Sequence, residues 1–142
     1  MKKIIIAADH GGFETKEMLK EYLTQDIVDV GYYEFDPLSN FPPLVLDLVE
    51  EVKKNKCFGI IICGSGIGVS IAANRHKGIR AALCHSVEYA KMARQHNDAN
   101  VLCLGGRYLG DIETKKIVDA FLNTDFLDGK YRVRMELIDK NL

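Results

Sequence analysis

Residues 60–74 read IIICGSGIGVSIAAN, an apolar strand pattern that passes through a glycine-rich turn into a helical pattern. Gly64, Gly66 and Gly68 allow the backbone to turn tightly and to approach a ligand closely. The helix that follows would direct unpaired N–H groups and the positive end of its dipole toward an anion. Cys63 begins this turn, and a thiol beside a helix N-terminus is typical of reactive cysteines. The stretch therefore predicts a site for chemistry at the end of a buried strand.

Short apolar runs alternate with longer segments of helical period along the whole chain. The runs contain few polar residues, as strands buried on both faces require, and we expect strands over 3–8, 27–30, 58–63, 80–84 and 101–104. Helices are expected over 13–24, 44–54, 67–75, 87–95, 112–122 and about 130–141. This alternation predicts an α/β fold, namely a three-layer α/β/α, doubly wound, Rossmann-like five-stranded parallel sheet, in one domain over residues 1–142.

Local sequence signals predict N-caps for two of these helices and an apolar face for the helix over 13–24. Ser86 and Asp111 are expected to be N-caps of the helices that follow them. In the helix over 13–24, an apolar face is expected at the spacing i, i+3, i+4, i+7, and Lys16 lies outside it. That face consists of Thr15, Met18, Leu19 and Tyr22.

Composition and charge limit the classes of function that this chain can have. The 142 residues are 47% hydrophobic and 27% charged, which suits one domain with a sizeable core. Nineteen basic and twenty acidic residues leave a formal net charge of −1, so no overall field recruits nucleic acid or a membrane. The apolar N-terminal stretch is too short for a signal peptide or a spanning helix, and we expect a cytoplasmic protein.

The four cysteines argue against a structural zinc site. None belongs to a C-x-x-C pair, and we expect neither a metal nor another cofactor. Cys57, Cys84 and Cys103 are expected to be core residues.

Polar residues collect where the expected strands end. In a parallel sheet, ligands bind beyond the carboxyl ends of the strands, near a switch in strand order. The segments that follow strands are Asp9-His10-Gly11-Gly12, Cys63-Gly64-Ser65-Gly66, Cys84-His85-Ser86 and Gly105-Gly106-Arg107. His96-Asn97-Asp98 instead follows the fourth helix and is expected near its opposite end, so a second subunit could supply it to the crevice.

Two phosphate-binding enzyme classes fit poorly. A cysteine phosphatase of the C-x5-R kind needs an arginine where this chain has Val69. A dinucleotide-binding module needs G-x-G-x-x-G after the first strand, and that position holds Asp9-His10-Gly11-Gly12. A non-enzymatic phosphate- or nucleotide-binding module remains open, although it leaves Cys63 and His96 without a purpose.

Several spaced motifs together resemble the type B ribose-5-phosphate isomerase family. They are Asp9-His10-Gly11-Gly12-Phe13, Cys63-Gly64-Ser65-Gly66-Ile67-Gly68, Arg94-Gln95-His96-Asn97-Asp98 and a basic C-terminal helix. The resemblance implies a doubly wound fold and an isomerase that interconverts ribose 5-phosphate and ribulose 5-phosphate in the pentose phosphate pathway. It also implies a homodimer or homotetramer with active sites shared between subunits, the C-terminal helix packing on a partner, and no metal.

The same resemblance assigns roles at the site. Cys63 would be the base that moves a proton between C1 and C2 through an enediolate, and His96 would act in ring opening. Asp9 would contact sugar hydroxyls, Ser65 would assist at the reacting oxygens, and Asn97 would hold the enediolate. The amides around Gly64, Gly66 and Gly68 would face that enediolate. The phosphate would be bound by His10, Arg107, Lys130 and Arg134.

Three departures from the family pattern leave the identity of the sugar open. The family usually has an acidic residue and a tyrosine where this chain has Asn40-Phe41, and an arginine-histidine pair where it has Lys130-Tyr131. Ser65 stands where threonine is commoner. A hexose 6-phosphate, of allose or galactose, is therefore the alternative substrate.

Overall fold

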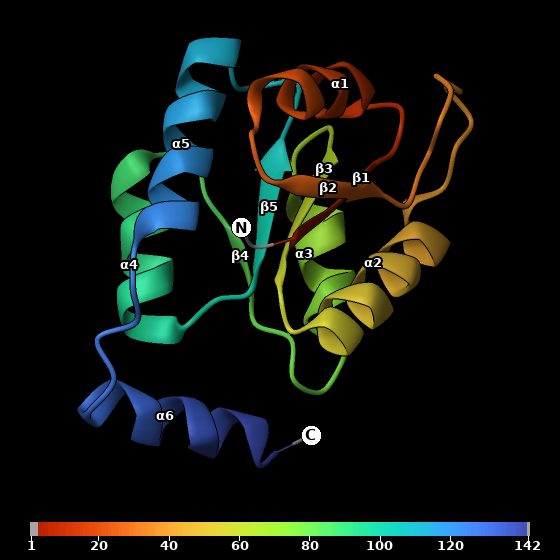
Figure 1. Cartoon of the computed structure of the whole chain (residues 1–142). Coiled ribbons are helices and arrows are strands. Elements are labelled where there is room, and N and C mark those ends of the chain that lie inside the picture. The colour runs from red at the N-terminus through yellow and green to blue at the C-terminus, as the bar shows by residue number, and fades with distance from the viewer. Residues whose placement is uncertain (1–2, 142) are drawn as a thin grey trace.

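A computed structural model describes residues 3–141 as a five-stranded parallel sheet with helices on both faces (Figure 1). The strand order β2-β1-β3-β5-β4 confirms the predicted three-layer, doubly wound α/β/α class. The elements are β1 (Lys3–Ala8), α1 (Phe13–Tyr22), β2 (Asp26–Asp29), α2 (Phe41–Asn55), β3 (Phe58–Cys63), α3 (Ile67–Ala73), β4 (Ala81–Leu83), α4 (Val87–Asn97), β5 (Val101–Gly105), α5 (Asp111–Asn123) and α6 (Lys130–Asp139).

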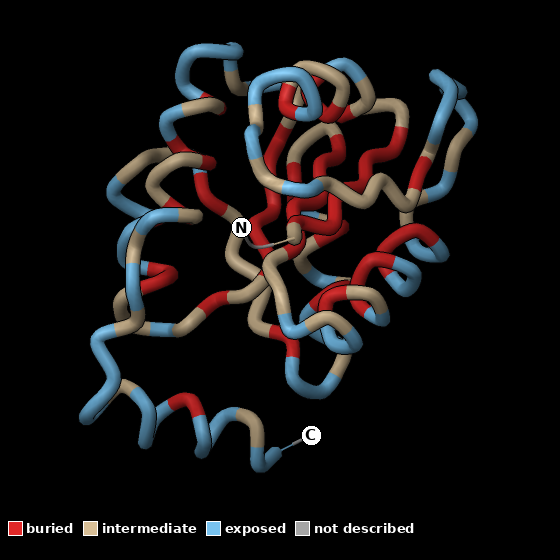
Figure 2. Tube along the Cα trace, in the orientation of Figure 1, coloured by how far each residue is buried: buried red, intermediate tan, exposed pale blue. Residues whose placement is uncertain are grey.

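The sheet separates two apolar cores. Successive side chains of a strand point to opposite faces, so Ile60 and Ile62 enter one core while Ile61 and Cys63 enter the other. Helices α1, α4 and α5 cover the first face, and α2 and α3 cover the second. The central strands β1, β3 and β5 are almost entirely buried, whereas the edge strands β2 and β4 are only partly covered (Figure 2).

Most element boundaries lie within a few residues of those expected, and β1 and β3 match residue for residue. Helix α2 begins at Phe41 rather than at residue 44, because Pro42 and Pro43 occupy its first turn, where a fixed φ suits the helix. Ser86 caps α4 as predicted. The N-cap of α5 is Gly110, so the prediction for Asp111 was wrong.

Other ends shift modestly. Helices α1, α3 and α6 end at Tyr22, Ala73 and Asp139, before their expected ends, and α4 continues through Asn97. His96 and Asn97 therefore lie in the last turn of α4 and not beyond it.

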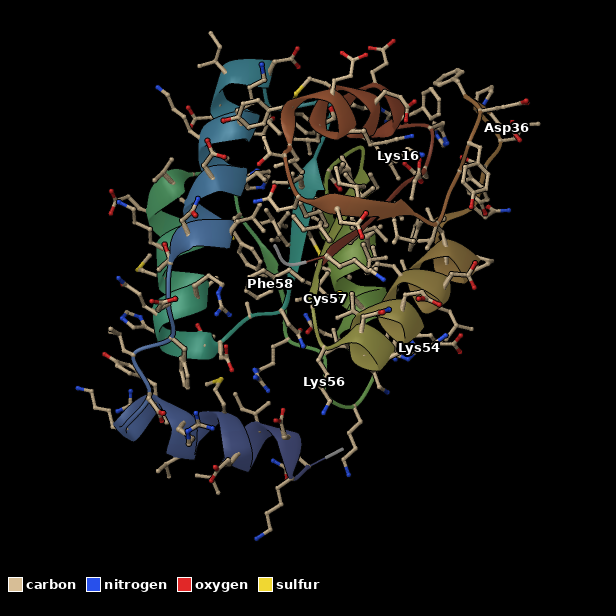
Figure 3. The ribbon with its side chains drawn as sticks, viewed as in Figure 1. Lys16, Asp36, Lys54, Lys56, Cys57 and Phe58 are labelled. Carbon is tan, nitrogen blue, oxygen red and sulfur yellow. The ribbon has the colours of Figure 1, made fainter. Side chains whose placement is uncertain are left out.

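Lys16 on α1 is fully buried, contrary to the expected placement outside the apolar face. Its Nζ lies 3.0 Å from Asp29 Oδ2 and also donates to the carbonyl oxygen of Tyr32. Figure 3 labels Lys16 on α1, beside the chain that follows β2. Burial of this cation is possible because a carboxylate and a carbonyl replace its water. Thr15 and Leu19 are buried as expected, whereas Tyr22 is 38% exposed.

Replacing Lys16 with methionine is expected to lower the free energy of unfolding by about 3 kcal/mol, because it removes one partner of a buried ion pair. Lys20→Met is the matched control, since Lys20 Nζ binds the same Asp29 carboxylate at 2.8 Å from a more exposed position. That exposed pair is expected to contribute about 1 kcal/mol or less. Urea unfolding measures both changes, and equal losses in the two variants would contradict the role given to Lys16.

Candidate active site

The loops that follow β1 and β3 diverge, because α1 and α3 cover opposite faces of the sheet. This divergence opens a crevice at the carboxyl ends of the strands. A cavity of about 230 Å³ lies there. It is lined by Asp9, His10, Gly11, Phe41, Cys63, Gly64, Ser65, Gly68, Arg107 and Tyr108. Seven of the residues predicted for the site therefore come together around one cavity.

Cys63 ends β3 at the wall of this cavity, and its thiol is nearly buried. The backbone N–H of Gly66 donates to Cys63 Sγ at 3.0 Å. Gly66 has φ +81°, a conformation that glycine adopts without strain and that turns this N–H back toward the sulfur. An N–H donor stabilises negative charge on the atom that accepts it, so the turn supports a proton-accepting sulfur.

The other three cysteines lie in different environments. Burial raises the pKa of Cys84 to about 11 and raises the pKa of Cys103 further above its ordinary range. Both are buried, as expected for core residues. Cys57 is only partly buried, so the core prediction was incomplete there, and burial raises its pKa as well. None of these three lines the cavity at the carboxyl edge.

Gly68 makes room for an aromatic ring above the start of α3. A Cβ atom at this position would lie 2.6 Å from the ring of Phe41, so the ring and the helix backbone are in direct contact. Phe41 thereby brings the start of α2 onto the cavity that holds Cys63. Its side chain supplies an apolar wall there.

Asp9 and Arg107 both line the cavity. Asp9 is buried, and its Oδ1 accepts the N–H of Gly11 at 2.9 Å, which fixes the carboxylate at the end of β1. Arg107 is exposed, and its side chain passes over Gly64. The N–H of Arg107 donates to the carbonyl oxygen of Gly64 at 3.1 Å, so the turns after β3 and β5 are held together.

His10 is held by a residue that the sequence did not single out. Ser39 Oγ accepts the backbone N–H of His10 at 3.0 Å and also lies 3.0 Å from His10 Nδ1. Ser39 belongs to the β2–α2 loop, residues 30–40. Long loops in compact domains are often functional, so the length of this loop is the signal by which the sequence could have pointed to it.

Four of the predicted residues lie at the opposite edge of the sheet. Helix α4 starts after β4 and runs back, so His96 and Asn97 in its last turn lie near the amino end of β5. The six residues of β3 separate that edge from Cys63 by about 20 Å. Figure 1 shows α6, which carries Lys130 and Arg134, beyond the same end of α4. Within one chain these four residues do not reach the Cys63 cavity.

Tyr131 lies among the site residues at this opposite edge, and the sequence had not predicted a role for it. Its ring stacks on His96, with centroids 4.6 Å apart and an interplanar angle of 17°. Lys130 Nζ and Arg134 Cζ lie 5.3 and 5.5 Å from the centre of the same ring. Both cations and the imidazole therefore surround one aromatic side chain.

Arg80 holds this group of residues against the sheet. Its Nη1 lies 2.8 Å from Asp139 Oδ2 on α6, and its Nε donates to the carbonyl oxygen of Asn97 at 2.8 Å. One guanidinium thus ties the end of α4 to α6. Asn97 Nδ2 also contacts Met135 Sδ, at 3.8 Å.

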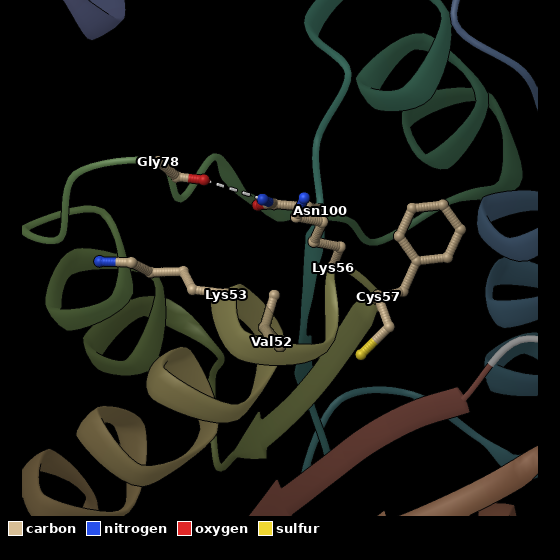
Figure 4. A pocket seen from close by; sticks show the side chains of 7 residues that line it. Val52, Lys53, Lys56, Cys57, Gly78 and Asn100 are labelled. Atoms are coloured by element: carbon tan, nitrogen blue, oxygen red, sulfur yellow. Dashed lines mark hydrogen bonds between the residues drawn. The ribbon is translucent and has the colours of Figure 1, made fainter.

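A second cavity, of about 330 Å³, lies at the amino end of β3 and contains none of the predicted site residues. Figure 4 shows the Lys53 ammonium and the Cys57 sulfur pointing in different directions. The Asn100 side chain is used in a hydrogen bond to the Gly78 carbonyl oxygen. Because the polar groups of this second cavity do not converge, the cavity at the carboxyl ends of the strands is the better candidate for the active site.

Residues 3–141 contain neither a metal-binding cluster nor a helix that could span a membrane. No group of three or more His, Cys, Asp or Glu side chains is arranged to hold a metal ion in this part of the chain. No helix in the same range combines the length and apolar character needed to cross a bilayer.

Comparison with known proteins places this site in a family. A family model described as Ribose/Galactose Isomerase matches residues 4–138. The chain belongs to the ribose/galactose isomerase family. This membership confirms the resemblance stated from the sequence motifs, and it favours an enzyme over the binding module that the sequence left open.

Relatives within the ribose/galactose isomerase family match over nearly the whole chain. A probable ribose-5-phosphate isomerase B of Mycoplasma genitalium is 44% identical over 95% of this chain and 92% of its own length. A crystal structure of a ribose 5-phosphate isomerase from Thermotoga maritima has a TM-score of 0.95 at 43% identity, covering 98% of both chains. The ribose-5-phosphate isomerase B of Mycoplasma genitalium with bound ribulose-5-phosphate has a TM-score of 0.94 at 42% identity, covering 98% of this chain and 95% of that one.

Proposed function

We propose that this chain is a ribose-5-phosphate isomerase, which interconverts ribose 5-phosphate and ribulose 5-phosphate in the pentose phosphate pathway. The observation that carries the proposal is its likeness, over 98% of its length, to the isomerase structure with bound ribulose-5-phosphate. The cavity at the carboxyl edge, with a thiol and a backbone N–H donor beside it, supports the same reaction. We further propose that the reaction needs no metal and takes place in the cytoplasm.

Cys63 is the base of the proposed reaction. Its thiolate removes the proton from C2 of the open-chain aldose, the C1 carbonyl becomes an enediolate, and the thiol returns the proton to C1. The proton of the C2 hydroxyl passes to the C1 oxygen, so that C2 becomes the new carbonyl and C1 carries the hydroxyl. One positioned base suffices because both carbons lie side by side, and donors near the oxygens stabilise the charge that develops there. The amides around Gly64, Gly66 and Gly68 and the Ser65 hydroxyl are the donors in this proposal.

The phosphate is assigned to the other end of the cavity. His10 and Arg107 line both the Cys63 cavity and a neighbouring cavity of about 300 Å³, so they form the wall between the two. A cation and a ring N–H are suitable partners for phosphate oxygens. Phosphate binding there would position the reacting carbons against Cys63, while Asp9 contacts the sugar hydroxyls between them.

A second copy of the chain completes the site in this proposal. His96 and Asn97, with Lys130 and Arg134, lie at the wrong edge of the sheet to reach Cys63 of their own chain. Apolar side chains are exposed at both edges, with Val133 and Leu137 on α6 and Ile67 and Ile71 on α3, beside Cys63. Burial of these patches against each other would bring the two groups together. We therefore propose a homodimer, or a homotetramer built from it, of single isomerase domains over residues 1–142, with the C-terminal helix packed on the partner.

The substrate is tested by turnover on ribose 5-phosphate, allose 6-phosphate and galactose 6-phosphate after treatment of the protein with a chelator. We expect ribose 5-phosphate to give the highest kcat/KM and the chelator to have no effect. Higher kcat/KM on a hexose phosphate would favour the alternative sugar, for which Phe41 in the cavity wall and Tyr131 on α6 are the responsible differences. Thermal-shift binding without turnover of any of the three would overturn the assignment as an isomerase.

A further inference from the structure

We propose that Ser39 is a positioning residue that holds the His10 ring in its Nε2–H tautomer, so that an N–H donor faces the anionic group of the substrate. This inference rests on the proposed function, because His10 is there assigned to the phosphate. It concerns a residue of the β2–α2 loop that itself lies outside the lining of the Cys63 cavity.

The hydrogen bonds around Ser39 select the tautomer. A serine hydroxyl has one proton to donate and two lone pairs to accept with. Ser39 Oγ already accepts the backbone N–H of His10, and His10 Nδ1 lies 3.0 Å from the same oxygen. If Nδ1 carried the proton of the neutral ring, the Ser39 hydroxyl proton would have no acceptor among residues 3–141. With Nδ1 as acceptor, the hydroxyl proton of Ser39 has a partner within the protein, and we infer this arrangement.

The second ring nitrogen is then the donor that remains. In a neutral imidazole one nitrogen carries the proton and the other accepts, so an Nδ1 that accepts from Ser39 places the proton on Nε2. No hydrogen bond to Nε2 is found within the described residues, and His10 lines the cavity that contains Cys63. This nitrogen is therefore available to a phosphate oxygen.

Hydrogen bonds fix the β2–α2 loop at both ends, so Ser39 is held in one position beside His10. At its start, the buried Lys16 donates to the Tyr32 carbonyl oxygen, and Asp29 Oδ1 accepts the N–H of Gly31 at 2.9 Å. Near its end, the Tyr32 hydroxyl donates to the Asn40 carbonyl oxygen at 2.6 Å. A side chain held on a fixed loop orients its partner with little loss of conformational freedom on binding.

The test combines kinetics with nitrogen-15 NMR of the histidine rings at mildly alkaline pH, where a histidine with the ordinary pKa is neutral. The His10 signals are assigned with a His10→Gln variant. In the wild type we expect protonated Nε2 and unprotonated Nδ1. Ser39→Ala is expected to give a mixture of tautomers and to raise KM for ribose 5-phosphate about tenfold with a smaller change in kcat, as for the loss of one charge-assisted hydrogen bond. Ser39→Thr, which keeps the hydroxyl, is expected to restore both.

Leu38→Ala is the matched control, because Leu38 precedes Ser39 in the same loop and is 84% exposed. It should leave both the tautomer and KM unchanged. A wild-type His10 protonated on Nδ1, or an unchanged KM in a folded Ser39→Ala protein, would overturn the inference. The ring tautomer is read without substrate, so absence of turnover in the wild type would overturn the proposed function and not this reading of Ser39.

Discussion

Replacing Cys63 with alanine is expected to lower kcat/KM for ribose 5-phosphate by about a thousandfold, in the range observed when a general base is removed. Cys63 is the cysteine that lines the carboxyl-edge cavity, and the Gly66 N–H donates to its sulfur at 3.0 Å. Alanine removes the group that carries the proton between C1 and C2 and leaves the walls of the cavity in place. Steady-state turnover measures the loss, and it should appear in kcat because the base acts in the chemical step.

Cys57→Ala is the matched control for this prediction. Cys57 immediately precedes β3, at the end of the strand opposite Cys63, and is only partly buried. It should therefore keep wild-type kcat/KM. Thermal unfolding of both variants separates a loss of chemistry from a loss of structure. Full activity in a folded Cys63→Ala protein would remove the thiol from the proposed reaction.

The layers of this fold were predictable because they depend on short-range patterns. The strands β1 and β3 are runs of β-branched apolar residues, and the sheet buries such runs on both faces. The end of α4 was harder to predict, since Gln95, His96 and Asn97 continue no apolar period. The helix persists there because Arg94 binds the Asp98 carboxylate and the Ala99 carbonyl oxygen across its end.

Lys16 was misplaced for a related reason. The periodicity of polar and apolar residues treats every lysine as exposed. Burial of Lys16 is possible because it pairs with the carboxylate of Asp29, which belongs to a different element. The buried Lys16 also binds the Tyr32 carbonyl oxygen and so fixes the start of the β2–α2 loop. The hydrogen bond between Ser39 and His10 relies on this loop, and short-range sequence patterns therefore did not predict it.

The same distinction separates the site residues that could be predicted from those that could not. Residues at or just beyond the ends of strands, such as Asp9, Cys63 and Arg107, could be placed together because parallel strands end at one edge of the sheet. Tyr131 could not be given a role, since the position of α6 depends on the pairing of Arg80 with Asp139. In the proposed dimer, α6 of the partner would complete the site, and patterns within one chain do not contain its position there.

Mixing two inactive variants is expected to restore activity if each site draws on two chains. His96→Asn and Cys63→Ala proteins should each turn over ribose 5-phosphate far more slowly than the wild type. A mixed dimer would contain one site with Cys63 from one chain and His96 from the other, both intact. After subunit exchange, we expect about a quarter of the wild-type activity, because random pairing makes half of the dimers mixed and each mixed dimer has one intact site.

The expectation follows from the opposite positions of the two residues, since Cys63 ends β3 at the carboxyl edge of the sheet and His96 lies near its amino edge. A mixture that is never allowed to exchange subunits is the control, and it should stay inactive. Native mass spectrometry of chains that carry different tags shows whether mixed dimers have formed. Mixed dimers without activity would mean that His96 serves no shared site, whereas a quarter of the activity would require that the imidazole cross from one chain to the thiol of the other.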